Sequence, residues 1–423
     1  MTVRSDLTPS SAIPLAYYAV AHAGLAGALL VLIVDPAQPG ASFYHPRMVA
    51  LVHLLTIPWI SGSILGSFYI VGPLALRVAM PAGNGDWVAF SSFVAGTIGM
   101  VGHFWIGTYD GMAWSAGLVT GAIAWVGIRA WRGLPGSPAP WPVSLHVALA
   151  FFNILAAAAL GILIGLDRTR GFLGLSPLAA MFAHVHLAAI GWATMMVVGL
   201  SYRLIPMILP AAMPTGRSLA ASAVLIETGL AVLTVTLLSG WPFVWTGALL
   251  ILAGLASFVA QIRQTVGRRM PRPPALPSRD WSTWQTHAAF LWLLIAAALG
   301  TILSTGVGAG HRLTLMWIYG VAGLMGFLAP IVTGMQGRLV PLYAWYRALA
   351  AKDSPPERSA NSLPHASFAR AIFLLWTPGL PLLAVGLPSE NQLAIRLAAL
   401  SLLGGVTVGG AYILYMLRQS RQS

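Results

Sequence analysis

Apolar runs long enough to cross a bilayer recur along the whole chain, and they constrain the fold more than any other feature. A transmembrane helix needs about 20 mainly apolar residues. Because backbone polar groups inside lipid must be satisfied within their own segment, each such run is expected to be a helix. The sequence therefore predicts an all-α polytopic membrane protein with about twelve transmembrane helices, at 12–34, 47–76, 87–109, 112–131, 142–166, 177–207, 218–239, 242–263, 283–304, 312–346, 367–387 and 391–417.

Charge placement indicates how the spans are oriented. Charged residues make up only 8% of the chain, against about a quarter in soluble domains. Of the 23 Lys and Arg, 18 fall on the face expected to hold both termini. The positive-inside rule then predicts cytoplasmic termini and a multi-pass protein of the bacterial inner (plasma) membrane. The lipid bilayer is the expected partner, and nucleic acid is not, because the arginines lie in short loops.

Three groups of four spans repeat along the chain. Pro-rich loops at 132–142 and 267–281 separate units 1–135, 136–275 and 276–423 of what is predicted to be a single membrane domain. The second spans of the units align without a gap. An aromatic residue, a glycine and a proline coincide in all three, at Trp59, Trp192 and Phe327, at Gly66, Gly199 and Gly334, and at Pro73, Pro206 and Pro341.

Histidines occur within these spans. His53 begins the repeat in the first unit and His186 in the second, while His184 lies two residues earlier and His103 late in the third span. All four are expected in the outer third of the bilayer, where a titratable side chain is by default functional. The sequence has no cysteine, so a metal would be held by His with Met, Tyr or carboxylate help. Imidazole suits iron and copper, although hydrogen bonding between helices is an alternative role.

His184 and His186 are predicted to serve different groups. Two residues on a helix correspond to about 200° of rotation, so the two imidazoles should point to nearly opposite sides. We expect His53 and His186 to be haem or metal ligands, His184 to serve a second group, and His103 to contribute to a metal site. Glu227, a carboxylate clearly inside a span, is either a proton-relay group or a structural residue paired with a hydroxyl.

The stretch HVHLAAIGWATMMVVGLSYRLIP resembles the His-X-His helix of haem-copper oxidase subunit I, especially in the C-type cytochrome c oxidases. The resemblance implies that His186 and His53 hold a low-spin haem b and that His184 holds a second haem facing copper. In that family the pair lies on the tenth helix, whereas here it lies on the sixth, and the adjacent His-His of the copper site is absent. The chain is therefore more similar to divergent, NnrS-like membrane haem or copper proteins.

These observations lead to one leading hypothesis and two alternatives. The leading hypothesis is a haem b protein with one or two haems, with copper as a further metal, acting in electron transfer or in O2 or NO chemistry near the outer face. It would resemble an oxidoreductase subunit whose partners are cytochrome c or other redox subunits. One alternative is non-catalytic binding of haem, copper or nitric oxide. The other is a secondary transporter, which is disfavoured because transporter repeats are usually inverted.

Overall fold

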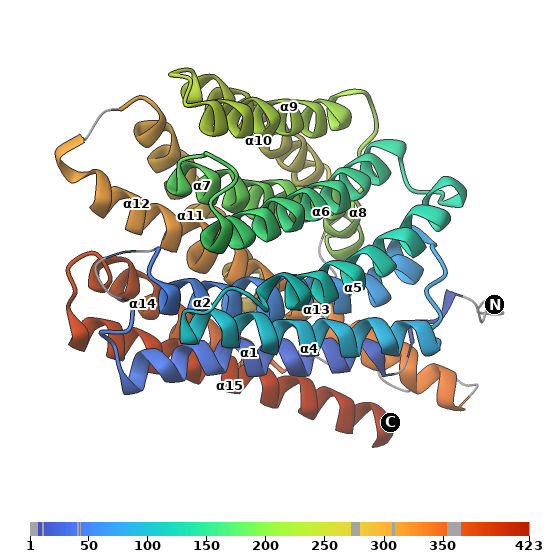
Figure 1. Ribbon diagram of the computed structural model, residues 1–423. Coiled ribbons are helices and arrows are strands. Elements are labelled where there is room, and N and C mark those ends of the chain that lie inside the picture. Colours follow the sequence, from blue (N-terminus) through green and yellow to red (C-terminus); the bar gives the residue numbers. More distant parts are fainter. Residues whose placement is uncertain are drawn as a thin grey trace.

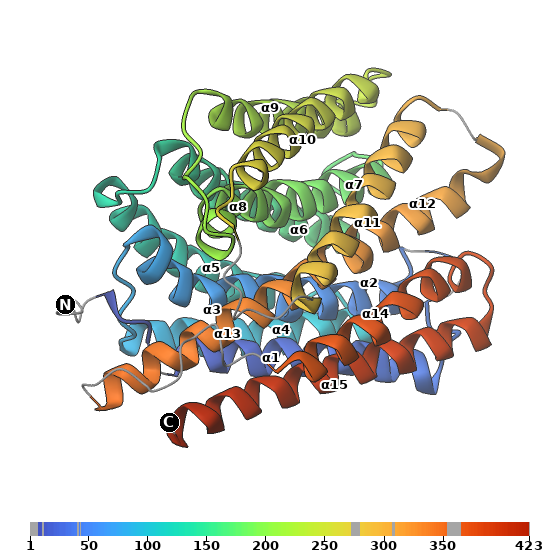
Figure 2. The ribbon, with the colours of Figure 1, turned by 180° about the vertical axis from the view of Figure 1, so that it is seen from behind.

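The computed structural model describes residues 7–10, 12–39, 42, 44–271, 280–306, 309–352 and 365–422. Within these ranges the chain is helical, with no strand beyond one isolated bridge between Ala211 and Arg269. Most of the long helices have roughly parallel axes and alternate in direction, and the two ends of the chain lie at the same end of the bundle (Figures 1 and 2). We call this end the terminal face and the other end the distal face.

Each of the three predicted units contains four long helical segments, the second of which is interrupted. The first unit comprises α1 (Ile13–Val34), α2 and α3 (Pro46–Leu54 and Gly62–Val71), α4 (Asn84–Ile106) and α5 (Met112–Gly133). The second comprises α6 (Trp141–Arg170), α7 and α8 (Pro177–His186 and Met195–Ile208), α9 (Ser218–Ser239) and α10 (Val244–Gly267). The third comprises α11 (Trp281–Ser304), α12 and α13 (Arg312–Gly320 and Ala329–Lys352), α14 (Ala366–Gly386) and α15 (Gln392–Gln422).

The predicted all-helical, multi-pass fold is confirmed, and the predicted spans agree with the helices to within a few residues at most ends. In the described part of the chain, eleven segments are both long and apolar enough to cross a membrane. The twelfth, α5, is 22 residues long but does not meet the same measure of hydropathy. Arg129 and Arg132 near its end contribute to this difference. Most of the loop predicted at 267–281 lies outside the described residues.

A π-helical stretch interrupts the second segment of every unit at the same place. These wider turns span Leu55–Ser61, Leu187–Thr194 and Val321–Leu328. Each begins within two residues of the position held by His53, His186 or Val321, and each contains the repeated aromatic residue. Pro58 lies inside the first stretch, but the other two contain no proline, so proline alone does not cause the widening. Because π turns inside α-helices are rare and frequently mark functional sites, their recurrence draws attention to this level of the bundle.

The repeated glycines allow the first and second segments of each unit to approach closely. A Cβ added to Gly66 would lie 2.9 Å from the Tyr17 Cβ on α1, and one added to Gly199 would lie 2.3 Å from the His146 Cβ on α6. At Gly334 it would lie 2.7 Å from an α11 side chain, Thr286. Small residues serve this purpose in membrane helix packing, so the glycines of the repeat have a structural explanation.

The units are arranged as a closed ring. In each, the third and fourth segments form a hairpin, and the fourth packs on the first segment of the next unit, through α5 with α6, α10 with α11, and α15 with α1. The interrupted segments meet in the centre. There the Trp192 indole donates a hydrogen bond to Ser61 Oγ (3.1 Å), and Gln336 Nε2 donates one to Ser63 Oγ (3.3 Å).

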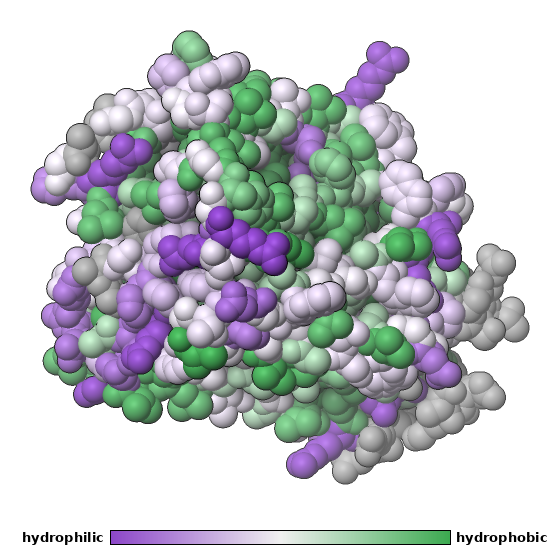
Figure 3. All heavy atoms as spheres, in the orientation of Figure 1, coloured by the Kyte–Doolittle hydropathy of each residue, from purple (hydrophilic) through white to green (hydrophobic). Residues whose placement is uncertain are grey.

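The outer surface is suited to lipid. Hydrophobic side chains cover much of the flank of the bundle in Figure 3, and large apolar residues such as Val88, Ile98 and Leu294 are more than half exposed. Such extensive exposed apolar surface is characteristic of contact with a membrane. The ring of helices therefore places its polar contacts inside the bundle and towards its two ends.

Candidate functional site

A cavity of about 480 Å³ lies between the three units towards the distal face. Its volume is within the range of about 300–1,000 Å³ typical of small-molecule and cofactor sites. Most of the side chains around it are apolar, and they come from all three interrupted segments and from neighbouring helices. The few residues that could act chemically include His53, His184, His186 and Tyr319. Three of the four histidines selected from the sequence therefore share one cavity.

His53 and His184 lie close together across the boundary between the first and second units. Their ring centroids are 6.3 Å apart and the ring planes differ by 22°. Two imidazole nitrogens bound on opposite sides of one metal, at about 2.0–2.1 Å each, are about 4 Å apart, and the ring centres lie further back on either side. The observed separation agrees with that arrangement, so these two side chains fit a shared metal.

Backbone hydrogen bonds fix which nitrogen each imidazole can offer. His53 Nδ1 lies 2.7 Å from the Val49 carbonyl oxygen, and His184 Nδ1 lies 2.8 Å from that of Ala157 on α6. A carbonyl only accepts, so both Nδ1 atoms carry the proton and the neutral rings keep a lone pair on Nε2. Within the described residues, neither Nε2 has a hydrogen-bond partner. Ligating histidines are typically oriented by such a bond on the other nitrogen.

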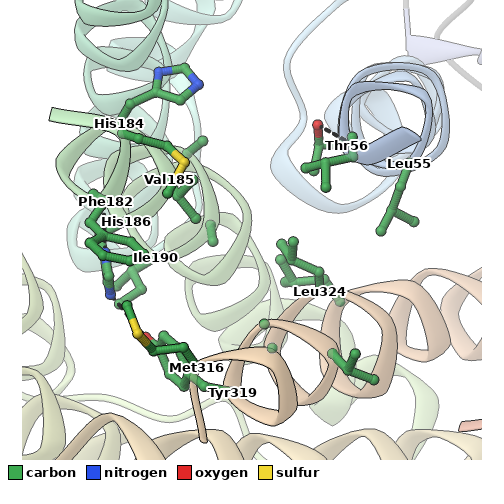
Figure 4. A pocket seen from close by; sticks show the side chains of 18 of the residues that line it. Leu55, Thr56, Phe182, His184, Val185, His186, Ile190, Met316, Tyr319 and Leu324 are labelled. Atoms are coloured by element: carbon green, nitrogen blue, oxygen red, sulfur yellow. Dashed lines mark hydrogen bonds between the residues drawn. The ribbon is translucent and has the colours of Figure 1, made fainter. Parts of the chain in front are cut away.

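His186 points away from His184, as Figure 4 shows, and the predicted divergence of the two rings agrees with this geometry. Its Nδ1 lies 2.7 Å from the Phe182 carbonyl oxygen, and its Nε2 lies 2.9 Å from the Tyr319 hydroxyl on α12. With Nδ1 protonated, Nε2 accepts the phenolic proton. The single turn that carries both histidines therefore supplies one imidazole to each of two unit boundaries.

The expected pairing of His53 with His186 is not the one in the structure, which places His184 beside His53. Repeat positions explain why. His184 and Tyr319 occupy equivalent places in the second and third units, as do His53 and His186 in the first and second. At each boundary, the position of His53 or His186 in one unit faces the position of His184 or Tyr319 in the next unit. The third boundary would join Val321 to Leu51, and both of these line the cavity as apolar residues.

His103 is not brought together with the other histidines. Its Nδ1 lies 3.2 Å from the Thr108 carbonyl oxygen at the end of α4, and its side chain does not line the cavity. Its neighbour Phe104 instead contacts the pair, with its ring centroid 4.7 Å from that of His53. In the described ranges, no three His, Asp or Glu side chains gather as a metal-binding group.

Glycines on α6 make room for the pair. A Cβ on Gly161 would lie 2.8 Å from His184 Cε1, and one on Gly165 would lie 1.5 Å from the terminal methyl of Met112. Ala157, Gly161 and Gly165 are spaced one helical turn apart. Small residues at that spacing mark close helix contacts in membranes, so this signal was present in the sequence. Tyr319, also missed, could have been found as the repeat counterpart of His184.

Two arginines line the cavity near the distal face. The Arg168 guanidinium lies over the rings of Tyr44 and Tyr109, at 4.4 and 5.1 Å from their centroids, and Arg312 lies at the start of α12. Partial burial raises the pKa of the Tyr44 hydroxyl, and the Arg168 charge opposes this effect. An apolar cavity with cationic groups at one end suits a ligand with an apolar body and an anionic edge.

A scan against protein-family models gives no match for the chain, and a search of curated proteins gives none either. Interpretation of the site therefore depends on its geometry.

Proposed function

We propose that the protein is a b-type haem protein of the bacterial inner membrane, in which His53 and His184 would hold a haem between them. The observation that carries the proposal is the apposition of these two imidazoles, each with Nδ1 bound to a carbonyl and Nε2 left as the lone-pair donor. Such bis-histidine coordination supplies one-electron transfer, with a potential set by the ligands and by burial.

The rest of the cavity is compatible with the same cofactor. Its apolar lining suits a porphyrin, and Arg168 and Arg312 would pair with the propionate carboxylates at the distal end. Phe104 packs against the His53 ring and restricts its orientation. His186 with Tyr319 forms a second polar pair in the same cavity, where a diatomic gas, a second haem or copper would bind. The ring of three like-ordered units supports an architecture like that of haem-copper oxidase subunit I, whereas the pairing of His53 with His184 departs from the ligand set that the resemblance implies. Electron transfer or O2 or NO chemistry is the proposed activity.

Cytoplasmic termini and exchange of electrons with cytochrome c or another redox subunit form part of the same proposal. The distribution of basic residues supports the orientation, which places the cavity near the outer face. Non-catalytic storage of haem or copper is the alternative. Metal analysis of the purified protein would distinguish it from the proposed function. Transport is less well supported, because the three units pack in the same order around the ring.

The first test is the optical spectrum of the purified protein. Dithionite-reduced protein from haem-replete cells should show a sharp b-type α-band, and acidic acetone should release the haem because the sequence has no cysteine to attach it. His53→Ala and His184→Ala should each lose the band, whereas His103→Ala, a histidine outside the cavity, should keep it. A colourless wild-type protein would contradict the proposal, and copper without haem would favour the storage alternative.

A further inference from the structure

Glu227 lies near the middle of α9 and points into the bundle. Its Oε2 accepts a hydrogen bond of 2.7 Å from Asn153 Nδ2 on α6. It does not line the cavity that holds the histidines, and the proposed haem site makes no use of it. A carboxyl group at this depth is costly to place in a membrane protein and is by default a functional group.

Asn153 is held in position by its own contacts. Its side chain is 2% exposed, and its amide nitrogen also donates to the Leu149 carbonyl oxygen (2.9 Å) one turn earlier. A Cβ on Gly191, in the π-helical stretch opposite, would lie 2.6 Å from the Asn153 Cβ. The site is therefore assembled from α6, α9 and a π turn, and the absence of a side chain at Gly191 leaves room for the amide.

No charged group faces Glu227 from the helices described around it. On α10, the stretch beside it packs through Gly247, Ile251 and Gly254. The titratable side chains on the packed helices lie at different levels along the bundle. On α6, His146 bonds to Ser222, and Asp167, Arg168 and Arg170 lie at the distal end of the helix. On α7, His184 and His186 line the cavity. On α8, Tyr202 bonds to Ser222 and Arg203 donates to the Ala75 carbonyl oxygen, and Arg263 lies near the end of α10.

We infer that Glu227, held by Asn153, is a proton-binding site within the membrane. A carboxylate removed from water needs a counter-charge or several donors to remain ionised. Here it has one amide donor, so Glu227 holds a proton at neutral pH and releases it only when a charge nearby changes. The ligand of the site is therefore the proton itself.

The position of the site gives this proton a role. Asn153, Ala157 and Gly161 follow one another at single-turn intervals along α6, about 6 Å apart. The Ala157 carbonyl accepts the His184 Nδ1 proton, and Gly161 lies beneath the His184 ring. The Glu227 proton is thus about one helical turn from the His53–His184 pair, on its terminal-face side. A charge arriving at that pair can be compensated at Glu227.

Infrared spectroscopy of the full-length protein in lipid nanodiscs tests the inference. At pH 7 the wild type should show the carbonyl stretching band of one protonated carboxylic acid. Glu227→Gln should remove the band, whereas Glu390→Gln, which alters an exposed carboxylate at the end of α14, should leave it unchanged. Asn153→Leu should keep the band and shift it to higher frequency, because the carbonyl loses its hydrogen-bond donor.

His53→Ala separates this inference from the proposed function. The Glu227 band should persist in that variant even though the axial haem pair is broken, so absence of haem does not count against the proton site. Identical spectra of wild type and Glu227→Gln at pH 7 would overturn the inference. So would a band that Glu390→Gln removes.

Discussion

Gly161→Ala should disrupt the proposed haem site without removing either of its proposed ligands. The new Cβ would lie 2.8 Å from Cε1 and 3.0 Å from Nδ1 of His184. Carbon atoms in normal contact are about 3.5–4.0 Å apart, so the ring must move by roughly 0.7 Å or more. Metal–ligand distances tolerate a change of only about 0.2 Å. The imidazole is therefore expected to leave the metal.

The cost to the fold should be small in comparison. Overpacking by one methyl group typically costs about 1–3 kcal/mol, and protein stabilities are about 5–15 kcal/mol. The variant should still fold, because the His184 ring is a side-chain end that can rotate once its bond to the Ala157 carbonyl breaks. A thermal melt should show a modest loss of stability alongside a large change at the haem.

Optical spectra with and without carbon monoxide provide the assay. If His53 and His184 both hold a haem as proposed, the wild-type haem should not bind CO readily, whereas the Gly161→Ala protein should bind CO because one ligand is lost. Gly121→Ala on α5 is the matched control, because its added Cβ has no neighbour within 4 Å. If the Gly161→Ala and Gly121→Ala proteins have the same spectrum and the same lack of CO binding, His184 is not a ligand and the geometric reasoning fails.

Three further predictions concern other parts of the molecule. Tyr319→His puts a histidine opposite His186 at the boundary between the second and third units, as His184 lies opposite His53 at the boundary between the first and second. It should add a second site with two histidines, detectable as extra bound metal; unchanged metal content would argue that the two boundaries are not equivalent. Arg129→Met leaves Asp86, 2% exposed, with only neutral donors from Tyr69, Trp125 and the Gly83 amide, and should lower the free energy of unfolding by about 3–5 kcal/mol; denaturation in detergent measures this, and a loss below about 1 kcal/mol would mean the pair is solvated. Reporter fusions at both termini should indicate the cytoplasm and a fusion between α9 and α10 the outside, and opposite signals would reverse the depth assigned to the cavity.

The helices could be predicted because a lipid environment leaves the backbone few choices. The length of each apolar run and the composition of the turns between runs then locate each segment. The span predicted at 47–76, for example, agrees with the helical segment Pro46–Leu76. The π turns could not be predicted in the same way. Only one of the three contains a proline, and the widening depends on how the second segments meet in the centre of the bundle.

The depth of the candidate site in the membrane could be predicted from the sequence, but which side chains lie next to each other could not. Depth within the spans brought His53, His184 and His186 together, and all three line one cavity. His53 and His186 hold equivalent positions in successive units, and in the structure each is directed to a different boundary between units. The order of the units around the ring decides which positions meet, and only the packing of α5 on α6 and of α10 on α11 reveals it. Depth alone also placed His103 at the same level, but whether its side chain reaches the cavity depends on how α4 is rotated about its axis.

Electron paramagnetic resonance of the oxidised protein tests the central claim most directly, since low-spin ferric haem with two histidines has a distinct signal. The account predicts that this signal disappears in His53→Ala and in His184→Ala but remains in His186→Ala, whose imidazole is directed to Tyr319. Loss of the signal in His186→Ala together with its retention in His184→Ala would contradict the account and restore the pairing expected from the repeat alignment.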